Sequence, residues 1–161
     1  MFFSKNTKID YTHKCLFEFP FTKVKDKPYP YIEVDLKYIE DDKSEKLVMC
    51  LLDSGADNCV FPKDLGVKLG IDFSEIDPID QEVKGIAGEI KDVKMYKSPL
   101  TIEFLGTSIL TEVIWIDKKD INPVIGRKGF FDKFDVYYKQ ATNRITLVFH
   151  PTPKCHLKDS T

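Results

Sequence analysis

The chain has 161 residues, of which 42% are hydrophobic and 31% charged, with a formal net charge of -2. This length suits one domain with its own core, and the composition excludes a disordered chain. Lysines and acidic residues are interleaved without a long single-sign block, so we expect no nucleic-acid partner and no membrane partner.

The longest apolar stretch, residues 47–52, is far too short to span a bilayer, and the apolar residues 1–3 are followed at once by polar ones. We therefore expect neither a signal peptide nor a transmembrane helix. The four cysteines, at positions 15, 50, 59 and 155, show no paired spacing. A reducing, cytoplasmic location is the expectation that fits them.

Strands predominate in the first third of the chain, judged by period-two alternation. The pattern predicts strands over 15–21 and 31–38 and a solvated hairpin loop over 40–46. The short apolar run 48–52 predicts a strand buried on both faces, paired with the strand over 31–38.

Directly after that run comes the turn sequence Asp53-Ser54-Gly55-Ala56-Asp57. Ser54 can hydrogen-bond locally, Gly55 allows a tight turn and Ala56 leaves room for an approaching group. Asp-Ser/Thr-Gly arises by chance in about one chain in fifteen of this size, so the motif alone is weak. We expect the Asp53 carboxylate to be half-buried, rigidly held and open on one side.

In the middle of the chain, residues 59–61 predict another strand, and Pro62 suits the start of a short helix that ends at Gly70. Residues 81–84 and 89–96 predict two strands around a glycine-bounded tip, Gly85-Ile86-Ala87-Gly88. A further hairpin is predicted over 100–104 and 109–116.

The last third begins with a short apolar strand, Pro123 to Arg127. The spacing of Phe130, Phe131 and Phe134 predicts one face of a short helix, and a final hairpin is predicted over 136–138 and 144–149. No internal repeat or linker is visible, so we expect no interior domain boundary.

Three segments in this order resemble the retropepsin-like aspartic proteases: Asp53 to Asp57, Gly85 to Gly88, and Val124-Ile125-Gly126-Arg127 before a helix. The resemblance covers residues 29–149 and implies a mainly β fold, a small closed β-barrel with a short C-terminal helix. Residues 1–28 would then be an N-terminal extension packed on the barrel, and 150–161 a C-terminal tail. Neither flank matches the minimal viral enzyme, which leaves the dimer interface open.

The activity implied by this resemblance is that of an aspartic endopeptidase. Such enzymes activate a water between two carboxyls about 3 Å apart, which share one proton because two like charges that close cannot both ionise. This chain has a single such turn, so the resemblance implies a homodimer with the two Asp53 carboxyls at the twofold axis. No cofactor and no metal are expected.

The resemblance also gives roles to the neighbours of Asp53. Ser54 would lock the two loops together across the axis, while Gly55 and Ala56 leave space for water and substrate. Asp57 would contact the substrate backbone and pair with Arg127, whose role would be structural support. An extended peptide or protein substrate would lie beneath a mobile tip formed by Gly85, Ile86, Ala87 and Gly88.

Other functions remain open at this stage. The main alternative is a non-catalytic domain of the same fold that binds an extended peptide segment of a partner protein. A metal-dependent hydrolase using Asp53, Asp57 and Asp92 is less well supported, because no histidine lies near the motif. A terminal metal site and a Ser54-based triad are the weakest readings; the terminal site would combine His13, Cys15, Cys155 and His156.

Overall fold

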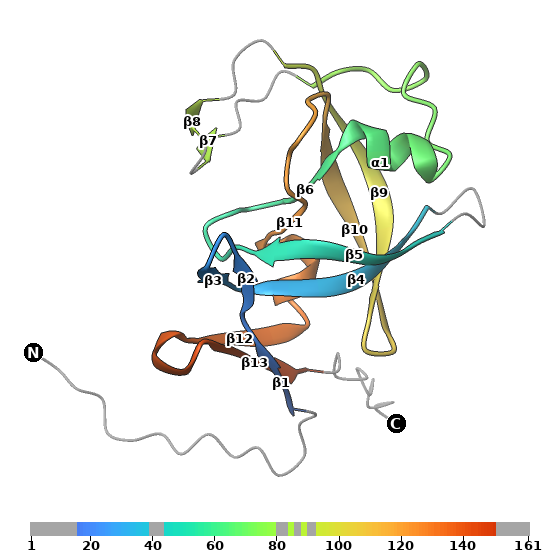
Figure 1. The fold of residues 1–161 in the computed structure, drawn as a ribbon. Coiled ribbons are helices and arrows are strands. Elements are labelled where there is room, and N and C mark those ends of the chain that lie inside the picture. Colours follow the sequence, from blue (N-terminus) through green and yellow to red (C-terminus); the bar gives the residue numbers. More distant parts are fainter. Residues whose placement is uncertain (1–15, 39–43, 80–83, 86–87, 90–92, 151–161) are drawn as a thin grey trace, which may run out of the picture.

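The computed structural model describes residues 16–38, 44–79, 84–85, 88–89 and 93–150. Strands make up most of these residues (Figure 1), which confirms the predicted mainly β fold. Six strands pair in a ring in the order β10, β6, β11, β5, β4, β9, and β9 pairs again with β10. They are β4 (Tyr31–Lys37), β5 (Ser44–Leu52), β6 (Cys59–Pro62), β9 (Met95–Phe104), β10 (Thr107–Ile116) and β11 (Val124–Ile125).

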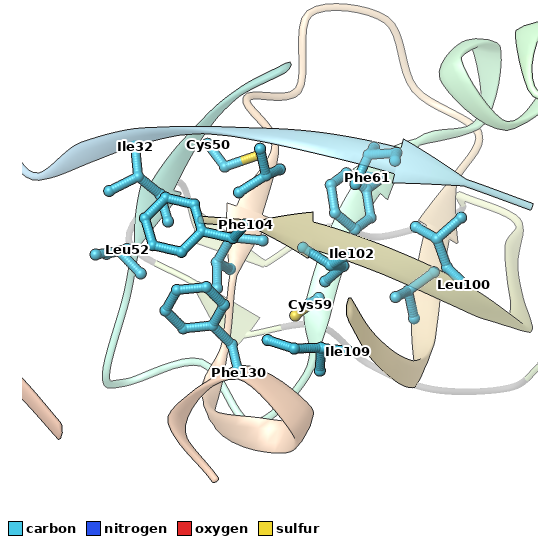
Figure 2. Close-up of a cluster of buried hydrophobic side chains, with 14 of the residues drawn as sticks. Ile32, Cys50, Leu52, Cys59, Phe61, Leu100, Ile102, Phe104, Ile109 and Phe130 are labelled. Carbon is cyan, nitrogen blue, oxygen red and sulfur yellow. The ribbon is translucent and has the colours of Figure 1, made fainter. Parts of the chain in front are cut away.

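The core of the protein lies inside this ring, because side chains of successive strand residues alternate between its two surfaces. Leu36, Leu100 and Ile102 are fully buried there. Figure 2 shows how the rings of Phe104 and Phe130 meet in this cluster, with their centroids 5.5 Å apart. The core thus gives the strands next to the candidate turn a fixed support.

A three-stranded sheet lies beside the ring and joins distant parts of the chain (Figure 1). Its order is β1 (Leu16–Pro20), β13 (Arg144–Phe149) and β12 (Phe134–Lys139), with antiparallel pairing throughout. Phe19 of β1 packs against Phe104 of the ring at a centroid distance of 5.9 Å. The sheet is therefore attached to the same core as the ring.

Glu18 fastens β1 to the other two strands of this sheet. Its carboxylate accepts hydrogen bonds from Lys139 Nζ at 2.8 Å and Thr146 Oγ1 at 3.3 Å, and it forms an ion pair with Arg144 Nε at 2.9 Å. The bond from Lys139, followed by that of Arg144, holds the pKa of Glu18 below its usual value. Ionised Glu18 therefore binds β1 to the hairpin more strongly than the neutral acid does.

Acid should loosen β1. Because the folded pKa of Glu18 is lowered, its contribution is present above the unfolded pKa and is lost as the pH falls through the folded pKa. Amide hydrogen exchange of residues 16–19 should accelerate as the pH falls below the usual pKa of a glutamate, beyond its intrinsic pH dependence. In Glu18→Gln these amides should exchange faster at neutral pH and lose the extra pH dependence. A variant that keeps the wild-type profile would show that the Glu18 carboxylate does not hold β1 in place.

The smaller elements surround these two sheets. Pro62 precedes α1, where its fixed φ suits the start of a helix, as predicted. No helix among the described residues is long and apolar enough to cross a membrane. The remaining elements are β2 (Thr22–Val24), β3 (Lys27–Tyr29), α1 (Lys63–Lys68), β7 (Lys84–Gly85), β8 (Gly88–Glu89), η1 (Arg127–Phe131) and η2 (Gln140–Thr142).

The strand before the candidate turn is buried on one face only. Cys50 and Leu52 are buried in β5, whereas Leu51 is half-buried and Met49 is 39% exposed. The prediction of a strand buried on both faces is therefore wrong: a strand of a ring turns one face to the inside and the other outward. Residues 44–46 also belong to β5 and not to the loop predicted over 40–46.

The predicted helix through Phe130, Phe131 and Phe134 is only partly correct. The helical segment η1 ends at Phe131, and Phe134 already belongs to β12. Gly129 interrupts it with a φ of 88°, a left-handed conformation that favours glycine. The rings of Phe130 and Phe134 still stack, with centroids 4.8 Å apart, so the aromatic contact forms without a continuous helix.

Candidate active site

Asp53 directly follows β5, and backbone hydrogen bonds hold both its N–H and its carbonyl. Its N–H donates to the carbonyl of Ile125 at 3.0 Å, and its own carbonyl accepts from Ala56 N–H at 3.2 Å. The Gly55 N–H donates to Asp53 Oδ1 at 2.8 Å. Asp53 as a whole residue is half-buried, and Ser54 is exposed. The structure thus provides an anchored carboxylate with one oxygen bonded inside the turn.

The second half of the turn is bonded to the segment after β11. Arg127 N–H donates to the Ala56 carbonyl at 2.8 Å, and Lys128 N–H donates to the Asp57 carbonyl at 2.9 Å. Gly126 sits where these two backbones come closest: a Cβ at this position would lie 2.2 Å from the Asn58 carbonyl oxygen. The glycine is therefore required by the close approach of one backbone to the other.

Asp57 and Arg127, which the sequence predicted to pair, are brought together. Arg127 Nη2 donates to Asp57 Oδ1. Both side chains are largely exposed in the single chain, at 74% for Asp57 and 59% for Arg127. An ion pair this exposed contributes only about 0–1 kcal/mol to stability. Whether these residues support the turn or touch a substrate stays a prediction.

The predicted glycine-bounded tip lies partly within the described residues. Gly85 of β7 pairs antiparallel with Gly88 of β8, and Lys84 pairs with Glu89. In Figure 1 this short hairpin stands clear of the six-stranded ring. Ile86 and Ala87, the predicted tip itself, lie outside the described residues. The hairpin geometry is thus observed at its base, and its role over a substrate remains a prediction.

Tyr138 is a neighbour of the turn that the sequence did not single out. Its hydroxyl, carried by β12, donates to the Leu52 carbonyl at 3.3 Å. Burial and the negative charge of Asp53 raise the pKa of Tyr138, and hydrogen bonds with Ser54 only partly oppose them. The hydroxyl therefore stays protonated at neutral pH. Tyr138 lies 86 residues along the chain from Leu52, so no local pattern could have revealed the contact.

Within the described part of the chain, no group of three or more His, Cys, Asp or Glu side chains is arranged to hold a metal ion. The proposed ligands His13, Cys15, Asp92, Cys155 and His156 all lie outside it. The thiols of Cys50 and Cys59 are buried, and burial raises the pKa of Cys59 to about 11. Cys59 is therefore no thiolate ligand at neutral pH.

Comparisons with known proteins agree with this geometry at the level of the fold. No protein-family model matches the chain, and comparison with curated proteins finds no similar sequence. Among solved structures, the chain is similar to a retropepsin-like aspartic protease from Rickettsia conorii, with a TM-score of 0.58 and 14% identity over 84% of this chain and 93% of that one. The fold is retropepsin-like.

A second solved structure with this fold is the retroviral protease-like domain of Ddi1 from Leishmania major. It matches with a TM-score of 0.50 and 16% identity over 78% of this chain and 97% of that domain. At these identities the likeness concerns the retropepsin-like fold alone.

Proposed function

We propose that the protein is an aspartic endopeptidase whose active site forms between two copies of the chain, with each six-stranded ring serving as the closed barrel of the retropepsin type. The observation that carries this proposal is the Asp53 carboxylate, anchored by Gly55 N–H at 2.8 Å yet left half-exposed at the end of a core strand. The backbone N–H of Asp53 is also bonded to the Ile125 carbonyl at 3.0 Å, so this turn is tied to β11 as well as to β5. A carboxylate fixed in this way is suited to act on a bound molecule.

In the proposed reaction the two Asp53 carboxyls share one proton and hold a water between them. The ionised carboxylate takes a proton from the water while the oxygen forms a bond to the scissile carbonyl carbon, and the neutral carboxyl gives its proton to the carbonyl oxygen. Collapse of the tetrahedral intermediate breaks the C–N bond: the leaving amine takes the proton that the first carboxylate removed from the water, and a hydroxyl of the intermediate returns a proton to the second carboxylate. One water is consumed and no cofactor is needed.

The exposure of the turn supports the need for a second chain. Ser54, Asp57 and Arg127 are all exposed in the single chain although the segment that carries them is tightly hydrogen-bonded. Among the described strands, β12 lies at the edge of its sheet and pairs with β13 alone. Because Tyr138 connects β12 to the turn, we assign this edge to the twofold interface.

Cleavage profiling of a peptide library by mass spectrometry, at mildly acidic and neutral pH, tests the proposal. We expect cuts within extended segments, from a protein whose solution mass is that of a dimer. The alternative is a non-catalytic domain that grips an extended segment of a partner through backbone hydrogen bonds. A strict monomer that binds peptides at micromolar concentration without cutting them would favour that alternative.

A further inference from the structure

The β4–β5 ladder lacks one hydrogen bond at the residue next to Asp53. Tyr31 faces Leu51 in the antiparallel register, so Pro30 faces Leu52. Leu52 N–H donates to the Pro30 carbonyl at 2.9 Å, as in a hydrogen-bonded pair, which normally exchanges two bonds. The return bond cannot form, because proline has no N–H. The Leu52 carbonyl is thus left without its ladder donor.

The Tyr138 hydroxyl fills this gap from a different sheet. It donates to the Leu52 carbonyl at 3.3 Å, and the Tyr138 side chain packs against the edge of the hydrophobic core. At the other end of the same peptide unit, Asp53 N–H donates to the Ile125 carbonyl at 3.0 Å. The peptide bond from which Asp53 projects is therefore held at both ends, once by β11 and once by β12.

We propose that Tyr138 is a positioning residue for Asp53: its hydroxyl replaces the N–H that Pro30 lacks and fixes the peptide plane that aims the carboxylate. This inference deepens the proposed function and rests on it. A rotation of this peptide plane would displace the carboxyl that must meet its symmetry mate. Small displacements of a reacting group are costly to the rate, while substrate contacts with other residues are unaffected.

The choice of donor has a structural consequence. A ladder N–H at position 30 would make the geometry of the turn depend on β4, its neighbour in the ring. Because the donor is the hydroxyl of Tyr138, the geometry of the turn depends instead on the position of the C-terminal hairpin formed by β12 and β13. Burial and the charge of Asp53 favour the neutral phenol, so the donor is available throughout the neutral range. The position of the C-terminal hairpin therefore affects the orientation of Asp53.

The test is a double-mutant cycle on Tyr138 and Pro30. Tyr138→Phe removes only the hydroxyl, and we expect kcat to fall about tenfold while KM changes by less than about twofold. Adding Pro30→Ala supplies the missing N–H, and the double variant should recover most of the lost kcat. Tyr29→Phe, the same change at an exposed tyrosine, is the matched control and should leave kcat unaltered. Wild-type kcat in Tyr138→Phe, or no rescue by Pro30→Ala, would overturn the inference.

A second readout separates this inference from the proposed function. Amide hydrogen exchange at Asp53 should be about tenfold faster in Tyr138→Phe than in the wild type, and Pro30→Ala should restore the protection. If no peptide is cleaved by the wild type, the proposed function fails, and the exchange rates alone decide whether Tyr138 fixes this peptide plane. Unchanged exchange at Asp53 in Tyr138→Phe overturns it.

Discussion

We expect Asp53→Asn to leave a folded protein that does not hydrolyse peptides. The amide oxygen of asparagine can still accept the hydrogen bond that Gly55 N–H makes to Asp53 Oδ1, so the turn should keep its shape. A neutral amide cannot take a proton from water or share one with its partner, and kcat should fall about 10⁴-fold or more. Peptide cleavage rates, with circular dichroism as the check on folding, measure both parts of the prediction.

Asp72 offers a matched control for this substitution. It makes the same local turn, since Ser74 N–H donates to Asp72 Oδ1 at 2.9 Å from two residues further along the chain. Asp72→Asn should leave cleavage unchanged, because this carboxylate lies in a turn outside the candidate site. If Asp53→Asn cleaves peptides as well as the wild type, the proposed mechanism is wrong.

Gly126→Ala should damage both stability and activity. The added Cβ would lie 2.2 Å from the carbonyl oxygen of Asn58, directly after the candidate turn, and 2.8 Å from that of Ala56 within it. Backbone held by neighbouring hydrogen bonds cannot move aside as the end of a long side chain can. We expect the free energy of unfolding to fall by about 3 kcal/mol or more, and Tm by about 10 °C.

Gly106→Ala separates this steric effect from the general cost of replacing a glycine. Gly106 has a φ of 76°, but a Cβ there would meet nothing within 4 Å. Its replacement should cost only about 1 kcal/mol, from the left-handed backbone alone, with cleavage intact. Urea denaturation of the two variants measures the difference. Equal losses in both would show that the approach at Gly126 is looser than the structure indicates.

The sequence predicted the parts of the fold that depend on local patterns. The strands around Asp53, the hairpin predicted over 100–104 and 109–116 and the base of the glycine-bounded tip all follow from alternation and turn residues, and the structure contains them. The first strand of that hairpin begins earlier than predicted, at Met95. The helix that was predicted to include Phe134 ends at Phe131, because Phe134 already pairs with Phe149 in the β12–β13 ladder. The spacing of the phenylalanines could not distinguish a helix that includes Phe134 from one that ends before it.

The candidate site was predictable only where its residues are contiguous. Asp53 to Asp57 form one turn in the sequence, and Arg127 entered through the resemblance to a known family. Tyr138 was missed, since its role depends on the register that places Pro30 opposite Leu52. The missing N–H of Pro30 is visible in the sequence, but its consequence appears only once the strand pairing is known. With that pairing, the Leu52 carbonyl needs a hydrogen-bond donor from outside the β4–β5 ladder.

The most direct test of a site shared between two chains is to mix wild-type and Asp53→Asn subunits. When equal amounts are refolded together, random pairing leaves about a quarter of the dimers with two Asp53 carboxyls. If both carboxyls are required, cleavage activity should fall with the square of the wild-type fraction, to about a quarter of that of undiluted wild type at the same total concentration. A linear fall, to about half at the same mixture, would show that each chain works alone and would contradict the shared site.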